Sequence, residues 1–342
     1  MSNSDSSSVL TESSMTKPDE KPWLSVIMPV YNGEKYLRLA LESIESEWNE
    51  HSGQISMEII ALDDGSSDSS LEILNEFGQR MPLHVICQER GGSWVRSTNR
   101  GLSMARGEYF CFLHQDDLWL PGRLKLLLQL SQTYPQAGML FHAVKYLDDR
   151  GRFLGQFRAP LQHGLNAPQL FVARLLVQNF IAIPAPMVKR SLLDSIGPMN
   201  PELWYTADWD YWLSIAQSSP VVYDRRAVAG FRIHNESQTV QRSVAQDRFR
   251  EQLTTVFERH YSRVVANSDF TLKDRGLDQV KKRAEFSMEV NIALAGMYHR
   301  GRFPWLALMK KALMLGPLGF YKFIQESRII DRVWARLKLP RH

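Results

Sequence analysis

Two adjacent carboxylates, Asp116 and Asp117, are the residue types of this chain that most directly suggest chemistry. They follow an apolar, aromatic run at residues 109–113, which is too short for a buried helix and predicts a buried strand. Neighbouring carboxylates repel each other unless a cation lies close, and carboxylates with a substrate diphosphate are a typical Mg²⁺ or Mn²⁺ site. A helix N-terminus decorated with Asp is the structural alternative, because Pro121 suits a first helical turn.

Strand-like and helix-like stretches alternate four times in the part of the chain that leads to this pair. Expected strands cover residues 24–31, 57–62, 83–87 and 109–113. The helices expected between and after them cover residues 34–48, 68–77, 93–105 and 121–133. This alternation predicts an α/β fold with a doubly wound, mostly parallel central sheet flanked by helices. Since each strand ends in polar residues, we expect these residues to converge on one edge of the sheet.

The rest of the chain continues this pattern and then changes. Further strands are expected at residues 139–144, 183–188 and 221–233, and helices at residues 170–177 and from residue 205. From residue 243 to residue 339 the pattern is helical. We therefore expect a disordered tail at residues 1–21, a main domain at residues 22–240 and a helical C-terminal extension at residues 241–342.

Composition sets limits on the class of protein. The chain has 342 residues, 44% hydrophobic and 23% charged, which is typical of globular domains. A net charge of +4 is mild, and we expect no nucleic-acid partner. The two cysteines, Cys87 and Cys111, stand inside apolar runs and indicate core residues of a reducing compartment. The N-terminus has no apolar signal-peptide region and no apolar run is long enough to span a membrane, so we expect a cytoplasmic protein.

Seven short segments follow one another along the chain in a characteristic order and spacing. They are residues 25–34, 63–68, 99–102, 105–109, 115–119, 207–213 and 231–234. Together they resemble the motifs of the family 2 glycosyltransferases, the inverting enzymes with the GT-A fold. The resemblance covers about residues 23–239.

Two positions depart from the family pattern. His114 stands where the family usually has the first Asp of Asp-x-Asp-Asp, and Ala207 stands where a Glu often precedes Asp208. The Gln-x-x-Arg-Trp segment of processive polysaccharide synthases is absent from the sequence. The resemblance therefore implies a non-processive enzyme that adds one sugar.

The resemblance also implies roles for single residues. It implies transfer of a sugar from a nucleotide-diphosphate sugar, with a UDP-sugar favoured, to a hydroxyl of a glycan, lipid-linked or other acceptor. Asp116 and His234 are implied to hold Mg²⁺ or Mn²⁺ against the diphosphate, and Asp208 is implied to be the base that deprotonates the acceptor. The nucleotide-sugar-binding residues that it implies are Pro29, Tyr31, Glu34, Asp64, Arg96, Asn99 and Asp117.

Structural roles compete with several of these assignments. Asp208 can be a helix N-cap, and Asp210 competes with it for the role of base. Tyr31 can be a core residue, Arg96 can lie on a solvated helix face, and His234 can be a structural strand residue. The segment at residues 303–341 mixes apolar and basic residues. It can lie on the anionic inner face of the cell membrane, or it can pack on the domain as a helical lid.

Three other functions compete with this interpretation, and the sequence argues against the first. An NAD(P)-dependent oxidoreductase would need Gly-x-Gly-x-x-Gly after the first strand, but residues 29–34 read Pro-Val-Tyr-Asn-Gly-Glu. A catalytically inactive nucleotide-sugar-binding or scaffold protein is compatible with His114 and Ala207. A nucleotidyltransferase is a more distant alternative.

Overall fold

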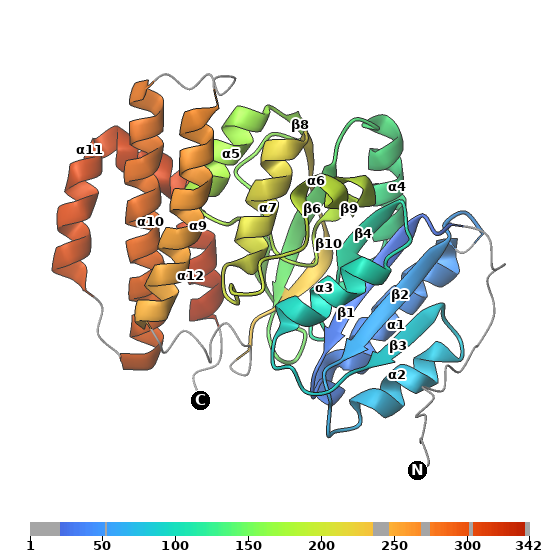
Figure 1. The fold of residues 1–342 in the computed structure, drawn as a ribbon. Helices are drawn as coiled ribbons and strands as arrows, with labels where there is room; N and C mark the ends of the chain where they lie inside the picture. Colours follow the sequence, from blue (N-terminus) through green and yellow to red (C-terminus); the bar gives the residue numbers. More distant parts are fainter. Residues whose placement is uncertain (1–20, 52, 235–245, 268–273, 301–303, 339–342) are drawn as a thin grey trace, which may run out of the picture.

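The computed structural model describes residues 21–51, 53–234, 246–267, 274–300 and 304–338. A central sheet carries helices on both faces, and four C-terminal helices pack along one side (Figure 1). Residues 1–20 of the expected tail lie outside the described residues, as does the expected boundary at residues 240 and 241.

The sheet has ten strands, and its first half is parallel. Its central path runs β3-β2-β1-β4-β9-β6-β10-β5, with β7 paired to β6 and β8 paired to β10. Strands β1 to β4 pair in parallel, as do β6 and β10, whereas β5, β7, β8 and β9 are antiparallel to their neighbours. The bounds are β1 Leu24–Val30, β2 Met57–Asp63, β3 Leu83–Cys87, β4 Tyr109–Phe112, β5 Leu118–Trp119, β6 Met139–Leu147, β7 Phe153–Phe157, β8 Gly164–Asn166, β9 Met187–Lys189 and β10 Val221–Arg232. The predicted α/β architecture with a mostly parallel sheet is confirmed.

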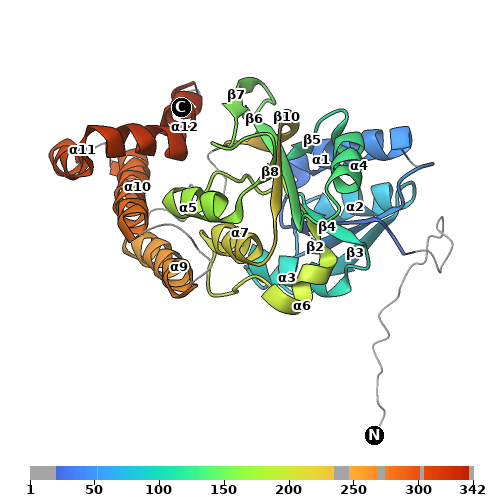
Figure 2. The ribbon, with the colours of Figure 1, turned by 90° about the horizontal axis from the view of Figure 1, so that it is seen from above.

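Helices form two layers around this sheet, each over its own apolar core. Helices α1, α2 and α4 cover one face, and α3, α5 and α7 cover the other, with the C-terminal helices beyond α5 and α7 (Figure 2). The bounds are α1 Glu34–His51, α2 Ser70–Gly78, α3 Trp94–Met104, α4 Arg123–Thr133, α5 Pro168–Val177, η1 Arg190–Leu192, α6 Leu193–Ile196, α7 Ala207–Ser218, α9 Gln246–Ala266, α10 Asp274–Arg300, α11 Trp305–Ser327 and α12 Ile329–Leu337. The C-terminal helices therefore extend the layer on one face of the sheet.

The loops that follow β1 and β2 cap each other's helices. The backbone N–H groups of Gly33 and Glu34 donate to Ser70 Oγ at 2.7 Å and to Asp68 Oδ2 at 3.0 Å. In return, Ser69 N–H donates to Glu34 Oε2 at 3.1 Å. Because side-chain oxygens satisfy the first N–H groups of both helices, the carboxyl ends of the two strands are held together.

Helix α4 begins later than the sequence predicts. Pro121 was expected in its first turn, but the helix starts at Arg123, after Gly122 with a φ of 85°. The buried carboxylate of Glu47 on α1 accepts the N–H groups of Gly122 at 2.7 Å and Leu124 at 2.8 Å. A side chain distant in sequence therefore sets this helix start, which local pattern cannot show.

The strand expected at residues 183–188 is also shorter than predicted, because β9 begins only at Met187. Pro184 and Pro186 lack the N–H that a sheet ladder requires, so the chain before Met187 stays outside the sheet. The Pro184 carbonyl instead accepts Arg123 Nη2 at 3.0 Å.

Gly107 stands in the turn that enters β4, where space for a side chain is absent. A Cβ atom there would lie 2.6 Å from both Ser25 N and Tyr109 O. We expect Gly107→Ala to lower the free energy of unfolding by about 1–3 kcal/mol, because backbone atoms must shift. Gly155→Ala is the matched control, since its Cβ would meet nothing within 4 Å. Urea unfolding checks this, and two variants of equal stability would contradict it.

Candidate active site

A cavity of about 380 Å³ opens at the carboxyl ends of the parallel strands β1, β2 and β4, beside the end of β10. Its volume is in the range of small-molecule sites, and this sheet edge is where open α/β folds bind ligands. Seven of the residues predicted from sequence line it, from strand ends and helix starts spread over the chain. They are Pro29, Tyr31, Asp64, Asp116, Asp117, Asp208 and His234.

Asp116 and His234 meet at one wall of this cavity. The Asp116 Oδ2 and His234 Nε2 atoms are 2.9 Å apart. Burial raises the pKa of Asp116, but the hydrogen bond from His234 and the charges of His114 and His234 lower it more, so the pKa lies below its usual value. The carboxylate is therefore held in its ionised form.

This pair fits a divalent metal. Two ligands that each lie about 2.1 Å from an octahedral ion at right angles are about 3 Å apart, and carboxylate with imidazole suits Mn²⁺. The described residues contain no cluster of three or more His, Cys, Asp or Glu side chains that could hold a metal. The pair therefore suits an ion that takes its remaining ligands from water and a bound phosphate.

Asp117 is locked into the fold beside this pair. Its Oδ1 atom accepts the backbone N–H of Arg232 at 3.0 Å, and the Arg232 Nε donates to the Asp116 carbonyl at 2.9 Å. Arg232 also donates from Nη1 to the Asp148 carbonyl at 2.9 Å. Burial, followed by the charge of Asp116, raises the pKa of Asp117 well above its usual value. Asp117 thus anchors the end of β10 to the loop after β4.

Asp208 lies at the start of α7 and faces the same cavity. Its Oδ2 accepts the Asn179 side-chain amide at 2.9 Å, and its Oδ1 accepts the backbone N–H of Trp209 at 2.8 Å. Burial raises the pKa of Asp208 to about 6, against the opposing effect of these two hydrogen bonds. A carboxylate that protonates near pH 6 is a stronger base than an ordinary Asp, which is an advantage in proton abstraction at neutral pH.

Asp210, the competing residue, points elsewhere. It accepts two hydrogen bonds from Arg259 at 3.1 Å and one from His260 at 2.9 Å, and it does not line the large cavity. His260 is fully buried, so this ion pair fixes α9 against α7. Of the two acidic residues, only Asp208 is placed to reach a ligand in this cavity.

Asp64 holds a loop beside the cavity. Its two oxygens accept the backbone N–H groups of Gly91 at 2.8 Å and Gly92 at 2.9 Å, and the guanidinium of Arg90. The Arg90 guanidinium also lies 3.3 Å from the centre of the Tyr31 ring. A cation over an aromatic face is stabilised by the ring quadrupole. Tyr31 and Arg90 therefore form one wall of the cavity, and Asp64 fixes that wall.

Three of the predicted residues do not line the cavity. Glu34 caps α2, as described above. Arg96 points into solvent, and its guanidinium lies 3.8 Å from the carboxylate of Glu202. Asn99 exchanges hydrogen bonds of 2.8 and 2.9 Å with the backbone of Met199 and joins α3 to the segment before α7. All three side chains therefore contact other parts of the protein outside the cavity.

Sequence reasoning missed several residues of the cavity. They are Arg90, Trp94, His114, Gln115, Asn179 and Arg232. Gln115 lies in a segment already recognised, and its side chain bonds both the N–H and the carbonyl of Tyr31, at 2.8 and 3.0 Å. His114, which stands where the family usually has an Asp, packs edge-on against Trp94 with ring centres 5.2 Å apart. Asn179 carries no local signal, because it reaches Asp208 only through the tertiary fold.

The family profile described as Glycosyl transferase family 2 matches residues 25–196, which is half of the chain. The chain belongs to glycosyltransferase family 2. An uncharacterised glycosyltransferase of Rickettsia typhi is 27% identical over 219 residues, covering 64% of this chain and 66% of the relative. One from Methanocaldococcus jannaschii is 30% identical over 196 residues, covering 57% and 64%. The match to a relative from Rickettsia felis spans 35% of its length, so this chain corresponds to only part of several curated relatives.

Solved structures of the same fold cover most of the chain. The structure of S. aureus TarS 1-349 in complex with UDP-GlcNAc has a TM-score of 0.63 and 18% identity, covering 93% of each chain. The mannosyltransferase PcManGT of Pyrobaculum calidifontis, in complex with GDP-Man and Mn²⁺, has a TM-score of 0.53 and 16% identity, covering 94% of this chain and 88% of that one. The predicted GT-A fold is thereby confirmed.

The raised pKa of Asp208 can be measured directly. We expect the Asp208 carboxyl carbon, assigned by its loss in Asp208→Asn, to titrate in an NMR experiment with a midpoint of about 6. Asn179→Leu removes a hydrogen bond to the ionised form, so its midpoint should move to higher pH. A midpoint at the ordinary value of about 3.9 in the unsubstituted protein would contradict the burial argument.

Proposed function

We propose that this protein is a metal-dependent, inverting glycosyltransferase that moves one sugar from a nucleotide-diphosphate sugar to an acceptor hydroxyl. The observation that supports this most is one cavity that holds both a metal-binding pair, Asp116 and His234, and a buried carboxylate, Asp208. Residues 22–240 supply this machinery. Residues 241–342 form an extension whose helices α9 and α10 pack on α7 and α5.

Each residue of the site has a task in this reaction. Tyr31 and Arg90 offer an aromatic and cationic wall to the nucleotide. Asp116 and His234 hold Mg²⁺ or Mn²⁺, which supplies charge stabilisation of the leaving diphosphate when bound. Asp208 takes the proton of the acceptor hydroxyl as its oxygen attacks the anomeric carbon. Asn179 and the Trp209 N–H keep the carboxylate oriented for that transfer.

A uridine nucleotide is the donor that we favour. TarS, whose fold covers 93% of this chain, has crystal structures in complex with UDP-GlcNAc and with UDP. The structure of PcManGT is a complex with GDP-Man and Mn²⁺, which supports a metal-bound diphosphate and makes a guanosine nucleotide the competing donor. These two structures do not identify the donor sugar or the acceptor of this protein.

Thermal melting with a panel of UDP, GDP, dTDP and CMP, each with and without Mn²⁺, tests the donor site. We expect one diphosphate, UDP first, to raise the melting temperature only with metal present. Asp116→Asn should abolish that rise, because one of two metal ligands is lost. Asp278→Asn, on the exposed face of α10, is the control and should keep it.

The melting experiment, together with a donor-hydrolysis assay, distinguishes an active glycosyltransferase from an inactive scaffold protein. If no nucleotide raises the melting temperature of the unsubstituted protein with or without Mn²⁺, then the active transferase is contradicted. If nucleotide binds but donor sugar is neither transferred nor hydrolysed, then a nucleotide-sugar-binding scaffold protein is the better description.

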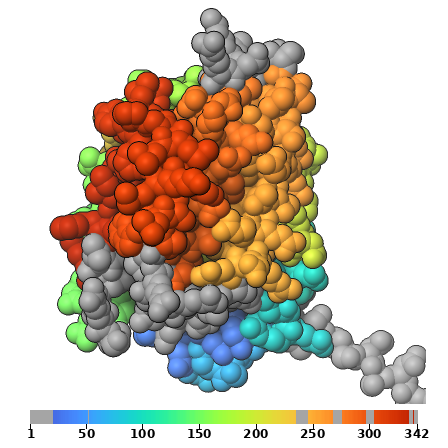
Figure 3. All heavy atoms as spheres, turned by 90° about the vertical axis from the view of Figure 1, so that its left-hand side faces the viewer, coloured from blue at the N-terminus to red at the C-terminus, as the bar shows by residue number. Residues whose placement is uncertain are grey.

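We also propose that the C-terminal helices touch the surface of an anionic membrane. Figure 3 faces the C-terminal helices. Helix α11, which is kinked at Gly316, exposes large apolar side chains before and after the kink, with Leu306 85% and Leu313 78% exposed. The others on α11 are Trp305, Met309, Met314, Leu318, Phe320 and Tyr321. The side chains of Lys310 and Lys322 are exposed on the same helix. None of the described helices combines the length and apolar character needed to cross a bilayer.

Exposed apolar side chains with lysines beside them fit an interfacial position, where apolar side chains enter the headgroup layer and cations meet anionic lipids. In flotation with vesicles, we expect binding to those that contain phosphatidylglycerol and weaker binding to pure phosphatidylcholine. Leu313→Glu should reduce binding, whereas Leu39→Glu, on the exposed face of α1, should not. The proposed membrane contact would be contradicted if the protein does not bind anionic vesicles, or if sedimentation shows a dimer formed through these side chains.

A further inference from the structure

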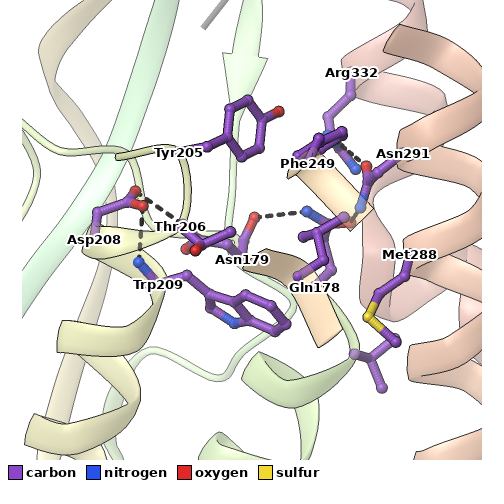
Figure 4. Close-up of a pocket in the computed structure, with 12 residues that line it drawn as sticks. Gln178, Asn179, Tyr205, Thr206, Asp208, Trp209, Phe249, Met288, Asn291 and Arg332 are labelled. Atoms are coloured by element: carbon purple, nitrogen blue, oxygen red, sulfur yellow. Dashed lines mark hydrogen bonds between the residues drawn. The ribbon is translucent and has the colours of Figure 1, made fainter. Parts of the chain in front are cut away.

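Two cavities adjoin Asp208, the large one and a smaller one of about 180 Å³ between α5, α7 and the C-terminal helices (Figure 4). A third cavity, of about 210 Å³, is separate from both, because it shares no lining residue with either. It lies where α6, the segment after α6, α7 and α9 meet. A ligand in this third cavity would therefore occupy a place distinct from the proposed donor site and base.

The wall of the third cavity is mostly polar. Among the described residues that line it, only Ile196 and Pro198 are apolar. The others carry hydroxyl, amide, carboxylate or guanidinium groups. Its volume lies below about 300 Å³, the lower end of the range for sites of drug-sized ligands, so the cavity suits a small polar ligand.

Two arginines give this cavity a positive charge. Arg259 and Arg263 stand four positions apart on α9, so they lie on the same face of the helix, and both line the cavity. The Arg259 Nη1 atom donates to both oxygens of Asp210 at 3.1 Å, so the charges of these two side chains offset each other. Arg263 is exposed and forms no ion pair with the described residues. The charge of Arg263 can therefore attract an anion.

The buried hydroxyl of Tyr211 supplies a second reason to expect a ligand. Tyr211 is 2% exposed and lines the cavity from α7, and its hydroxyl makes no hydrogen bond within the described part of the chain. Burial raises the pKa of Tyr211, so the hydroxyl stays protonated and able to donate. A buried donor without an acceptor is unfavourable, so this hydroxyl favours a ligand that brings an acceptor oxygen.

Hydrogen-bond donors line the cavity from three parts of the fold. Arg263 lies on α9, Tyr211 on α7, and Asn200 on the segment between α6 and α7. The Asn200 Oδ1 atom accepts the Glu202 N–H at 3.1 Å, and the Asn200 amide nitrogen is a further donor. Donors on several sides suit a tetrahedral anion better than a planar carboxylate, which a single guanidinium binds through two parallel bonds. A phosphate group has this shape and charge.

We propose that the third cavity binds a phosphate group, held by Arg263 and the Tyr211 hydroxyl, at a place separate from the nucleotide-sugar site. Arg263 supplies the charge, and Tyr211 supplies a hydrogen bond from a buried position. Asp210 stays paired with Arg259 and with the fully buried His260, so its negative charge is offset where the anion binds. The site does not depend on the proposed transferase activity, because no residue that lines it belongs to the proposed donor or metal site.

Calorimetric titration with inorganic phosphate tests this site. EDTA is present so that no divalent ion can hold phosphate at the donor site, and sodium chloride keeps the ionic strength constant. We expect saturable binding with a dissociation constant of about 1 mM or tighter. Arg263→Gln should weaken this binding by about tenfold or more, because a charge-assisted contact is lost. Arg248→Gln, which removes an exposed charge elsewhere on α9, should bind as the unsubstituted protein does.

Tyr211→Phe tests the buried hydroxyl. This variant should bind phosphate about threefold more weakly or worse, because the ligand loses one hydrogen bond. Its melting temperature without phosphate should not fall, because the hydroxyl has no partner to lose within the described part of the chain. If the variant melts at a lower temperature and binds phosphate as the unsubstituted protein does, then the hydroxyl has a structural role and the proposal is contradicted.

Glycerol 3-phosphate, titrated in the same way, separates the two sources of a phosphate group. Binding as tight as that of inorganic phosphate, and equally weakened in Arg263→Gln, indicates a phosphate ester as the ligand. If inorganic phosphate binds and the ester does not, the free ion is the ligand.

Three further results would overturn the inference. The first is the absence of saturable phosphate binding, and the second is equal binding by Arg263→Gln and the unsubstituted protein. The third is loss of phosphate binding in Asp116→Asn with retention in Arg263→Gln, which would assign the phosphate to the donor site. None of these results alters the expected melting shift with UDP and Mn²⁺, so the proposed function is tested separately. The melting temperature of each unliganded variant shows that it is folded.

Discussion

The hydrogen bond from the Arg232 backbone to the buried Asp117 carboxylate, 3.0 Å long, is the contact on which the site depends. It ties the end of β10 to the loop after β4, across 115 positions of sequence, and the Arg232 side chain adds bonds to the carbonyls of Asp116 and Asp148. Buried polar groups are favoured when they find hydrogen-bond partners, and these bonds hold the two strand ends together. Asp116 and His234 meet because of this anchor. The proposed metal-binding pair comes from two strands that are not neighbours in the sheet, so it needs such a fixed frame to keep its spacing.

Asp208 depends on a different kind of constraint, which is desolvation. Its carboxylate accepts hydrogen bonds from Asn179 and the Trp209 backbone, and burial raises its pKa to about 6 against their effect. Asp210, two positions along, lies in a similar helical turn but is neutralised by Arg259 and His260, and its pKa is lowered. Helix α7 therefore carries two aspartates with different roles. Burial makes Asp208 more basic, whereas Asp210 forms an ion pair that holds the fold together. The C-terminal helices contribute to both, because α9 supplies the partners of Asp210 and α10 closes the space beside Asp208.

The sequence alone predicts the alternation of strands and helices, the carboxylates at the strand ends and the order of the motifs. These features depend on strand periodicity and local turn chemistry, which are local properties of the sequence. They predicted the parallel half of the sheet and seven residues that do line the cavity. What local pattern could not show is which polar side chains are already occupied by tertiary partners. Asn99 bonds to Met199, a hundred positions away, and Asn179 reaches Asp208 from the end of α5. Glu47 likewise starts α4 from another helix. Arg332 stands beyond every recognised motif, and only packing brings it to the site.

The central claim is a single displacement in which Asp208 deprotonates the attacking oxygen. The most direct test follows the anomeric configuration of the product by real-time proton NMR. Water can serve as the acceptor, so hydrolysis of an α-linked UDP-sugar with Mn²⁺ needs no knowledge of the natural one. The account predicts that the β anomer of the free sugar appears first and only later equilibrates. Initial release of the α anomer would contradict a single displacement and the role given to Asp208.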